Sequence, residues 1–378
     1  MKKILFIMPG LSVGGLERVQ VSIANALVKK GHDVTVMMLN PEYALAGELD
    51  EKVKLVHKPY KPHKIMKKIP YVRDKFYDDG MWETRASAKK LYKYYVGKEK
   101  FDVEIAFFRG LSVKILSGST NINAKKLAWV HNDFTFCGGY TNNFKNLDKV
   151  KQAYDKFDNI IAVSKQAKES FSKVIGSADK VKAVYNLSDS ADILGKAQEK
   201  ADINKKKTTI ASVGRIVDAK GYDRLINMAE KLNANGLDYD LWIIGDGSEL
   251  EKLQEIVHQK NLKNVQFLGS QANPYKYMKQ ADLYVCSSRY EGYNLTVAEA
   301  LILGVPVLST NCTGPCEILD DGNYGVIVEN GEEGLYTGIK DLLSNPDKLA
   351  YYKQKAIERK DFFNEEKIIG EIEELFGE

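Results

Sequence analysis

Residues 283–300 read Leu-Tyr-Val-Cys-Ser-Ser-Arg-Tyr-Glu-Gly-Tyr-Asn-Leu-Thr-Val-Ala-Glu-Ala. The first four residues form a short apolar run, typical of a strand that is buried on both faces. Asn294 is a good helix N-cap, and the apolar residues after it continue to Gly304, a good helix terminator. The segment therefore predicts a strand, a polar loop at its carboxyl end, and a helix.

The same alternation extends along the chain in two series. The first series predicts strands at residues 4–8, 33–39, 103–108, 126–130 and 159–163. The second series predicts strands at residues 209–213, 240–244, 264–267, 283–286, 306–309 and 325–328, with helices at 222–235, 247–260 and 294–303. Two such series predict an α/β protein with two doubly wound parallel sheets.

The domain boundaries follow from this pattern. We expect residues 1–187 to form one domain, 188–207 a polar linker, and 208–360 a second domain. Ligands of doubly wound sheets bind at the carboxyl ends of the strands. A cleft between two such domains is therefore the expected site.

The composition is that of an ordinary globular protein, with 378 residues, 44% hydrophobic and 28% charged. A net charge of +4 is too small to indicate nucleic-acid binding. The 4 Cys are irregularly spaced and indicate neither a disulfide framework nor a zinc site, which favours the cytoplasm. The first apolar run is too short for a signal peptide, and no apolar run approaches the ~18 residues of a membrane span.

Residues 58–100 are rich in Lys and Arg. Such a run is usually a solvated face. Within it, residues 58–76 interleave basic and apolar side chains, which also suits peripheral contact with an anionic membrane.

Three groups of polar residues follow predicted strands. Gly214, Arg215 and Lys220 could grip one anion, although two solvated loop cations are the alternative. Near the Asn294 helix start, a seat for a diphosphate, Glu291 and Glu299 could accept hydrogen bonds from sugar hydroxyls, or Glu299 could pair with a structural Lys or Arg.

The third group lies in the first domain. His131 could transfer a proton or bind a sugar hydroxyl, or it could be a capping or core histidine. Asn132 and Asp133 follow it, and Arg109 occupies a similar strand end. The Gly14-Gly15 loop lets backbone N–H groups approach a ligand, but it is not the dinucleotide-binding glycine motif.

These motifs occur in a recognisable order. They are Ser212-x-Gly214-Arg215 with Lys220, Gly245-Asp246-Gly247, Phe267-Leu268-Gly269 and the Glu291/Glu299 pair, preceded by Gly14-Gly15 and His131. The chain thereby resembles the retaining family-four glycosyltransferases of the GT-B fold, in which two Rossmann-like domains face each other across a cleft. The resemblance covers nearly the whole chain and is thinnest from about residue 45 to residue 100.

The resemblance implies a role for each matching residue. Arg215 and Lys220 would neutralise the donor diphosphate, Glu299 would hold the ribose, and Glu291 would contact the transferred sugar. His131 would lie near the anomeric carbon, and we expect it to be catalytic together with Glu291, Arg215 and Lys220. The other expected donor-binding residues are Gly15, Gly214, Gly245, Gly269, Gly292, Tyr293, Asn294 and Leu295. The expected acceptor-binding residues are Gly14, Arg109, Asn132 and Asp133. The helix at 361–378 would pack back on the first domain.

The expected chemistry needs no metal, because the cations and the helix start can stabilise the charge that develops on the leaving diphosphate. No Asp-x-Asp pair follows a strand. The resemblance implies retention of the anomeric configuration. A front-side path is preferred to a covalent intermediate, because no carboxylate stands out as a nucleophile.

The resemblance thus implies transfer of a hexose or N-acetylhexosamine from a nucleotide sugar, with UDP as the expected nucleotide. The expected acceptor is a lipid-linked saccharide or other glycan of a surface polysaccharide such as a capsule, at the inner face of the membrane. The alternatives are a non-catalytic nucleotide-sugar-binding partner of another transferase and a GT-B sugar-nucleotide epimerase.

Overall fold

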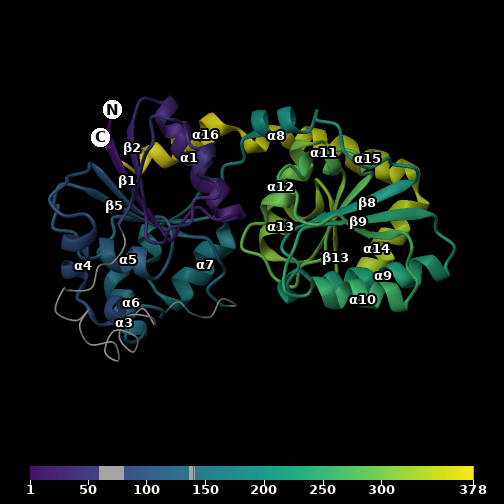
Figure 1. The fold of residues 1–378 in the computed structure, drawn as a ribbon, viewed down its shortest axis with the longest axis horizontal. Coiled ribbons are helices and arrows are strands. Elements are labelled where there is room, and N and C mark those ends of the chain that lie inside the picture. The colour runs from purple at the N-terminus through teal and green to yellow at the C-terminus, as the bar shows by residue number, and fades with distance from the viewer. Residues whose placement is uncertain (59–80, 136–138, 140, 378) are drawn as a thin grey trace. The chain divides into compact units, whose positions relative to one another are not determined.

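The structure is a computed structural model that describes residues 1–58, 81–135, 139 and 141–377. The chain divides into two units (Figure 1). The N-terminal unit comprises Met1–Leu187 and Glu366–Glu378, and the C-terminal unit comprises Ser188–Glu365.

The N-terminal unit is built on a parallel sheet whose described strands have the order β3-β2-β1-β4-β5-β6-β7. The strands are β1 (Lys3–Met8), β2 (Asp33–Met38), β3 (Lys54–His57), β4 (Val103–Ala106), β5 (Lys125–Val130), β6 (Asn159–Ala162) and β7 (Val181–Ala183). Parallel neighbours need crossover connections, which are mostly helical here. The helices are α1 (Gly15–Lys29), α3 (Met81–Arg85), α4 (Ala88–Tyr95), α5 (Leu111–Leu116), α6 (Leu147–Tyr154), α7 (Lys165–Val174) and α16 (Glu365–Glu374).

The C-terminal unit repeats this design with the strand order β10-β9-β8-β11-β12-β13, again parallel. Its strands are β8 (Thr208–Val213), β9 (Tyr239–Ile244), β10 (Val265–Phe267), β11 (Leu283–Cys286), β12 (Val307–Thr310) and β13 (Val326–Val328). Its helices are α8 (Ser190–Lys196), α9 (Tyr222–Ala234), α10 (Leu250–Gln259), α11 (Tyr275–Met278), α12 (Leu295–Ile302), α13 (Thr313–Ile318), α14 (Glu332–Ser344) and α15 (Pro346–Arg359).

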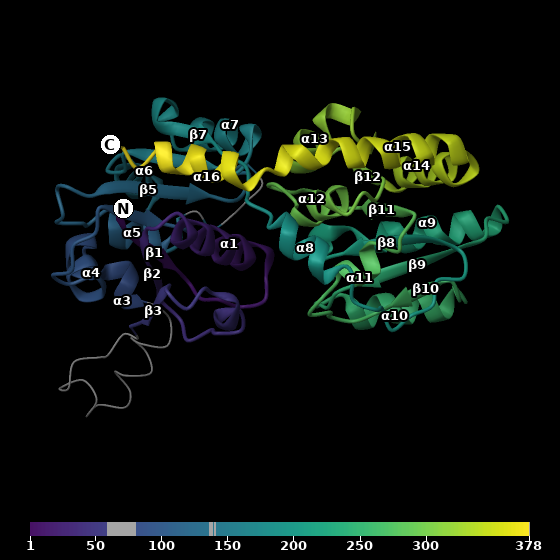
Figure 2. The same ribbon diagram turned by 90° about the horizontal axis from the view of Figure 1, so that it is seen from above.

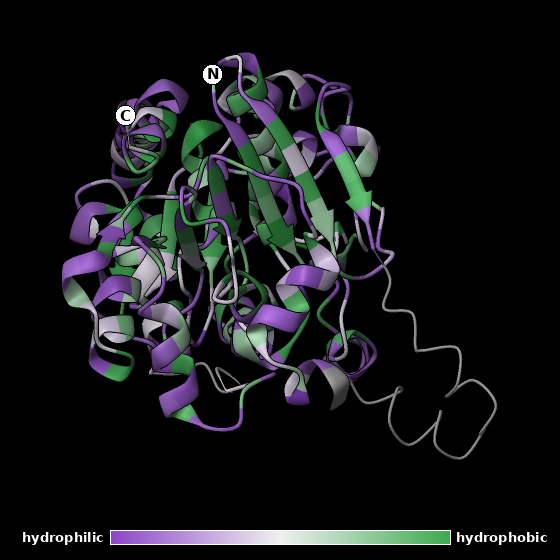
Figure 3. Cartoon of the chain, turned by 90° about the vertical axis from the view of Figure 1, so that its left-hand side faces the viewer, coloured by the Kyte–Doolittle hydropathy of each residue, from purple (hydrophilic) through white to green (hydrophobic). Residues whose placement is uncertain are grey.

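The central strands form the core of each unit. Ile4–Met8 of β1 and the four residues of β4 are buried, and Figure 3 shows the hydrophobic colour along the strands of the N-terminal sheet. In the C-terminal unit, Leu225, Ile226 and Ala229 of α9 pack against the sheet in one cluster of buried side chains. The continuous apolar runs therefore become strands that helices cover on both faces.

The predicted α/β fold class with two doubly wound parallel sheets is confirmed. Two strands were not expected from the sequence, the edge strands β3 and β7. Residues 188–207, expected to form a linker, contain α8, which packs on α11 and α12 within the C-terminal unit.

The last helix, α16, lies along the N-terminal unit in Figure 2. The carboxylate of its Glu373 accepts a hydrogen bond from the imidazole of His32, with 2.8 Å between Oε1 and Nε2. Phe376 packs edge-to-face on the same imidazole. The C-terminal helix thus belongs to the same unit as the N-terminal residues of the chain.

The order of the strands also indicates where each sheet would bind a ligand. The chain order reverses between β1 and β4 in one sheet, and between β8 and β11 in the other. Ligands of open α/β sheets bind at the carboxyl ends of strands beside such a reversal. The loops after β1, β4, β8 and β11 are therefore the places to look for chemistry.

Candidate functional site

An ion pair spans the strand reversal of the C-terminal sheet. Lys220 follows β8, Glu291 follows β11, and 2.6 Å separates the Nζ of the first from the Oε1 of the second. Burial by itself lowers the pKa of Lys220, but the charge and hydrogen bond of Glu291 outweigh it and raise the pKa above its ordinary value. Lys220 therefore keeps its positive charge at the carboxyl ends of the strands of this sheet.

The turn that carries Lys220 is tied to the loop after β11. The Ser287 hydroxyl donates to the carbonyl of Lys220 over 2.8 Å, and the Arg289 N–H donates to the carbonyl of Ala219 over 2.8 Å. Gly221 has a φ of 65°, and a Cβ there would lie 2.3 Å from the Ser287 carbonyl oxygen. Only glycine permits this close approach, which places Lys220 beside Glu291.

The guanidinium of Arg289 braces the same turn. It donates to both carboxylate oxygens of Asp223, over 2.9 Å and 2.7 Å, and to the carbonyl of Asp218 over 2.7 Å. Such a two-pronged pair fixes orientation as well as distance. Arg289 is thus a positioning residue for the Lys220 turn.

The carboxylate of Glu291 is held on one side only. Its Oε1 accepts from Lys220, from the Ser288 hydroxyl over 2.6 Å and from the Asn294 amide over 3.0 Å. Within the described part of the chain, its Oε2 has no donor. An ionised carboxylate oxygen accepts hydrogen bonds, so Oε2 is the atom that a ligand hydroxyl can use.

Asn294 links this carboxylate to the start of α12. It adopts a left-handed conformation with φ of 75°, and its Oδ1 accepts from the N–H of Val297 over 3.1 Å. The first N–H groups of α12 point out of the helix, as in every helix start. The segments after β8 and β11 therefore present an ammonium, a carboxylate and a helix N-terminus together.

Glu299 lies one turn further into α12 and is 8% exposed. Its Oε1 accepts a hydrogen bond from the Tyr275 hydroxyl over 3.1 Å. Tyr275 thus orients the carboxylate that the resemblance assigns to ribose. Its role in ribose binding stays a prediction.

The remaining predicted donor residues lie around the same strand ends. Arg215 is exposed, forms no ion pair in the described residues, and is close enough for its charge to oppose protonation of Lys220. The Gly214 N–H donates to the carbonyl of Ile244, and the Gly245 N–H donates to the carbonyl of Gly269. Gly292, Tyr293 and Leu295 lie in the loop and at the helix start between Glu291 and Glu299.

His131 follows β5 in the N-terminal unit. Its Nε2 lies 2.8 Å from the carbonyl oxygen of Phe107, and its ring lies parallel to that of Trp129. Burial lowers the pKa of His131 to about 4, against the opposing effect of the Phe107 hydrogen bond. The carbonyl can only accept, so Nε2 carries the proton and Nδ1 of the neutral ring is an acceptor.

The structure brings three of the predicted first-domain residues around one small cavity. Arg109, His131 and Asn132 line a cavity of about 10 Å³, which has room for about one water molecule. Asp133 differs, because its carboxylate accepts from the N–H and hydroxyl of Thr135 and from Gln166. Acceptor binding by these residues stays a prediction.

The Gly14-Gly15 loop opens α1. The Glu17 carboxylate folds back over it, since a Cβ on Gly14 would lie 2.3 Å from Oε2 of Glu17, and the Ser12 hydroxyl donates to Oε1 over 3.1 Å. A carboxylate there already complements the positive end of the helix dipole. The ligand contact predicted for Gly14 and Gly15 stays a prediction.

Sequence reasoning missed Arg289, Ser288 and Tyr275. The available signal for Arg289 was that arginine is rare in this chain and that this one follows a strand, but its partner Asp223 is too distant in sequence to suggest the pairing.

Among the described residues, no group of three or more His, Cys, Asp or Glu side chains could hold a metal ion. In the same residues, no helix is long and apolar enough to cross a membrane. Cys137 and all of residues 58–76 except Lys58 lie outside the described residues.

Comparison with known proteins adds independent findings. The profile of glycosyl transferases group 1 matches residues 195–359, and that of glycosyltransferase family 4 matches residues 13–191. An uncharacterized glycosyltransferase of Haemophilus influenzae is 27% identical over 98% of this chain and 99% of its own length.

A second relative comes from Campylobacter jejuni. It is an N-acetylgalactosamine-N,N'-diacetylbacillosaminyl-diphospho-undecaprenol 4-alpha-N-acetylgalactosaminyltransferase, 32% identical over 60% of this chain and 63% of its own length. Among solved structures, HepE of Anabaena, in complex with UDP and glucose, has a TM-score of 0.75 at 18% identity over 99% of each chain. TarM of S. aureus has a TM-score of 0.78 at 17% identity, over 100% of this chain and 99% of its own.

Proposed function

Because the chain belongs to the group 1 and family 4 glycosyltransferases and has the GT-B fold, we propose that it transfers a hexose or N-acetylhexosamine from a UDP-sugar to a saccharide acceptor. The transfer retains the anomeric configuration and needs no metal ion. The proposed acceptor is a lipid-linked saccharide or other glycan in the assembly of a surface polysaccharide.

One observation carries the proposal for the donor. Lys220, Glu291 and the start of α12 meet at the strand reversal of the C-terminal sheet, with Arg215 exposed after β8. Two cations and a helix N-terminus suit a diphosphate, and the uncommitted Oε2 of Glu291 suits a sugar hydroxyl. The UDP complex of HepE supports uracil as the base of the donor nucleotide.

The proposed chemistry follows from this charge distribution. An acceptor hydroxyl oxygen bonds to the anomeric carbon while the bond from that carbon to the β-phosphate oxygen breaks, and UDP departs. The hydroxyl proton passes to the departing phosphate on the same face of the sugar, which retains the configuration. Arg215, Lys220 and the α12 N-terminus stabilise the charge that grows on the phosphate.

His131 has a narrower role in this proposal than proton transfer. Its neutral ring offers Nδ1 as an acceptor, because Nε2–H is committed to Phe107. We assign it to the hydrogen bond with a sugar hydroxyl. Arg109 and Asn132, which line the same cavity, are the neighbouring candidates for acceptor contacts.

The proposed acceptor class draws on the Campylobacter relative, whose name contains a diphospho-undecaprenol-linked saccharide. A lipid-linked acceptor would place the protein in the cytoplasm, peripheral at the inner face of the membrane. The basic and apolar residues of 58–76 supply the proposed contact with anionic lipid.

Isothermal titration with UDP tests the donor site. Arg215→Ala and Lys220→Ala are each expected to weaken UDP binding by about 10- to 100-fold, since each removes a charge-assisted contact. Lys252→Ala, which breaks an exposed pair with Glu249, is the matched control and should bind UDP normally. Unchanged affinity in both site variants would contradict the proposal.

Turnover distinguishes the alternatives. A transferase converts the UDP-sugar to UDP and a glycosylated product when a lipid-saccharide extract is supplied. Binding without turnover in any acceptor extract would indicate a non-catalytic partner protein. Conversion of the sugar in the donor alone would indicate an epimerase.

A further inference from the structure

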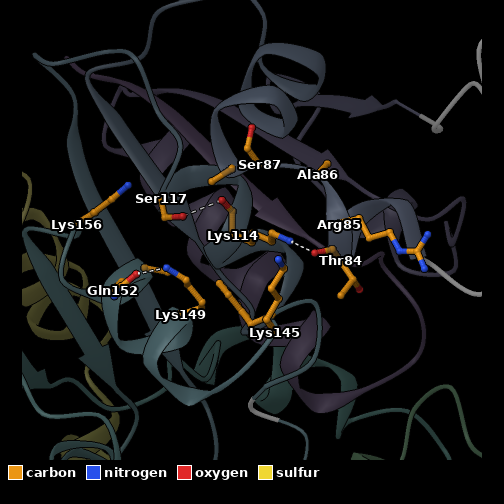
Figure 4. A pocket seen from close by; sticks show the side chains of 13 residues that line it. Thr84, Arg85, Ala86, Ser87, Lys114, Ser117, Lys145, Lys149, Gln152 and Lys156 are labelled. Atoms are coloured by element: carbon orange, nitrogen blue, oxygen red, sulfur yellow. Dashed lines mark hydrogen bonds between the residues drawn. The ribbon is translucent and has the colours of Figure 1, made fainter.

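A basic pocket lies among the helices of the N-terminal unit, and the proposed donor site does not use it (Figure 4). Its volume is about 370 Å³. Among the described residues, the cationic side chains that line it are those of Arg85, Lys114, Lys145, Lys149 and Lys156. The described part of the lining includes no carboxylate, which is unusual in a surface where the two charges generally mix.

Lys114 supplies a fixed charge at the base of the basic pocket. It is 8% exposed, and its Nζ donates to the carbonyls of Glu83, Thr84 and Asn143 over 2.6, 2.7 and 2.8 Å. These three bonds use all of its donors without neutralising its charge. A nearly buried ammonium without a bonded carboxylate is costly unless some other charge compensates it.

A second ammonium faces the first. Figure 4 shows Lys145 reaching toward Lys114, whereas Arg85 points away from the centre. Burial lowers the pKa of Lys114, the charge of the Glu83 carboxylate opposes that shift without reversing it, and the Lys145 charge adds a smaller contribution that lowers the pKa further. The two like charges therefore repel each other in the described structure.

Lys149 completes the group on the exposed rim. Its Nζ donates to Oε1 of Gln152 over 2.8 Å. Among the described residues, neither Lys145 nor Lys149 pairs with a carboxylate. Both side chains are exposed, so their remaining N–H donors are open to an anion.

The walls of the basic pocket are fixed by the backbone. A Cβ on Gly118 would lie 2.1 Å from the carbonyl carbon of Ala88, so only glycine lets the end of α5 meet the start of α4. Ser87 caps α4 by accepting from the N–H of Lys90. The positive end of the α4 dipole therefore adds to the charge of the lysines.

We propose that the basic pocket binds a phosphate or diphosphate group. Among the described residues, no carboxylate is bonded to Lys114 or Lys145, so an anion would stabilise these facing ammonium groups, and Lys ammonium groups bind phosphates as point charges. If the proposed function is right, on which this extension rests, the group belongs to the acceptor, a saccharide joined to phosphate or diphosphate. The N-terminal unit would then recognise the acceptor by charge, separately from the donor diphosphate.

The test uses the full chain with Arg215→Ala and Lys220→Ala already present, so that the donor site does not contribute. Inorganic pyrophosphate is titrated into this parent and into the same protein with Lys145→Gln and Lys149→Gln. The control adds Lys151→Gln and Lys173→Gln, which remove the same charge from α6 and α7 outside the pocket. The pocket variant is expected to bind at least about tenfold more weakly than the control.

A second arm identifies the source of the phosphate. Flotation with phosphatidylglycerol vesicles, compared with phosphatidylcholine vesicles, detects binding to lipid phosphate. Loss of either pyrophosphate or phosphatidylglycerol binding in the pocket variant alone supports the proposal and names the source. Equal binding by the pocket variant and the control, or binding of neither probe by the parent, overturns it.

Failure of the basic-pocket proposal can be distinguished from failure of the donor-site proposal. UDP affinity is measured in the protein with only Lys145→Gln and Lys149→Gln, where it should equal that of the unchanged protein. The pocket can therefore fail while UDP binding stands, and UDP binding can fail while the pocket stands.

Discussion

The two units of this protein have the same sheet design but differ in how their strand-end residues are held. In the C-terminal unit, Lys220 and Glu291 neutralise each other, and Arg289 fixes the turn between the strands. In the N-terminal unit, His131 is uncharged and held by stacking and one carbonyl, while the positive charges gather in the basic pocket.

This difference teaches how a shared fold can carry two kinds of recognition. Groups of opposite charge that lie 2.6 Å apart are assembled before a ligand arrives, so little reorganisation remains for binding. In the basic pocket, by contrast, the described residues show no carboxylate bonded to Lys114 or Lys145, so an anion would complete the site. The C-terminal site is thus preorganised, and the basic pocket is poised for a charged ligand.

The largest expected effect comes from Glu291→Gln. The amide can still accept from Lys220 and Ser288, but it loses the charge that strengthens the bond to a sugar hydroxyl. We expect sugar transfer to slow by about 100-fold or more, while UDP affinity stays equal or rises because Lys220 is no longer neutralised. UDP release with a lipid-saccharide extract and UDP titration measure the two effects.

Glu249→Gln, on an exposed pair with Lys252, is the control for that change and should leave both quantities unaltered. If UDP affinity collapsed in Glu291→Gln, the carboxylate would serve mainly to hold Lys220 in place. In that case, preorganisation of the C-terminal site would consist in the placement of Lys220 alone.

The second effect concerns His131 and pH. Its folded pKa of about 4 lies below the ordinary 6.5, so between these values the unfolded chain binds a proton that the folded chain does not. Stability is therefore lost as pH falls through 6.5 toward 4, and His131 alone accounts for a loss of about 2 kcal/mol between pH 7 and pH 5.

Urea unfolding at the two pH values measures this loss, and His131→Asn should reduce it. His258→Gln, on the exposed face of α10, should leave the pH dependence as it is in the unchanged protein. An identical pH dependence in His131→Asn would show that the ring is not held neutral by its surroundings. The stated difference between an uncharged His131 in the N-terminal unit and the ion pair in the C-terminal unit would then be wrong.

The smallest effect is expected for Arg289→Gln. Loss of the two-pronged pair with Asp223 frees the Lys220 turn without removing a ligand-binding charge. We expect UDP binding to weaken by about tenfold, and by much less when Lys220→Ala is already present, because the two residues act through one contact. Titration of the single and double variants gives the coupling.

Lys231→Gln, also on α9, is the control, since the Lys231 ammonium pairs with Glu332 and Glu333 of α14. If Arg289→Gln weakened binding equally with and without Lys220, the bracing assigned to Arg289 would be wrong.

Most of the fold could be predicted from the sequence, because central parallel strands are buried on both faces and read as continuous apolar runs. The two strands that were not predicted, β3 and β7, lie at the sheet edges and are short and half-exposed. Helix α8 was missed because the surrounding residues are polar and give little periodicity, although Asp189 caps it.

In the candidate site too, residues that a local pattern marks could be predicted, and residues that depend on distant partners could not. Lys220, Glu291 and Asn294 could be named because each lies in the segment after a predicted strand or begins a helix. Arg289 and Tyr275 act through partners 66 and 24 residues away, so no local spacing reveals them. The basic pocket could not be predicted, since its lysines come from separate helices whose packing, at Gly118 for example, brings them together.

The placement of α16 has one more consequence. Because Glu366–Glu378 belong to the N-terminal unit, Ser188–Glu365 are inserted within it and joined to it by two covalent crossings. A protease that cuts only after Leu187 would leave the fragments associated, with α16 of the longer piece still seated on the shorter one. Separation requires cuts at both crossings, or displacement of a helix that carries Phe376 into the apolar surface around His32.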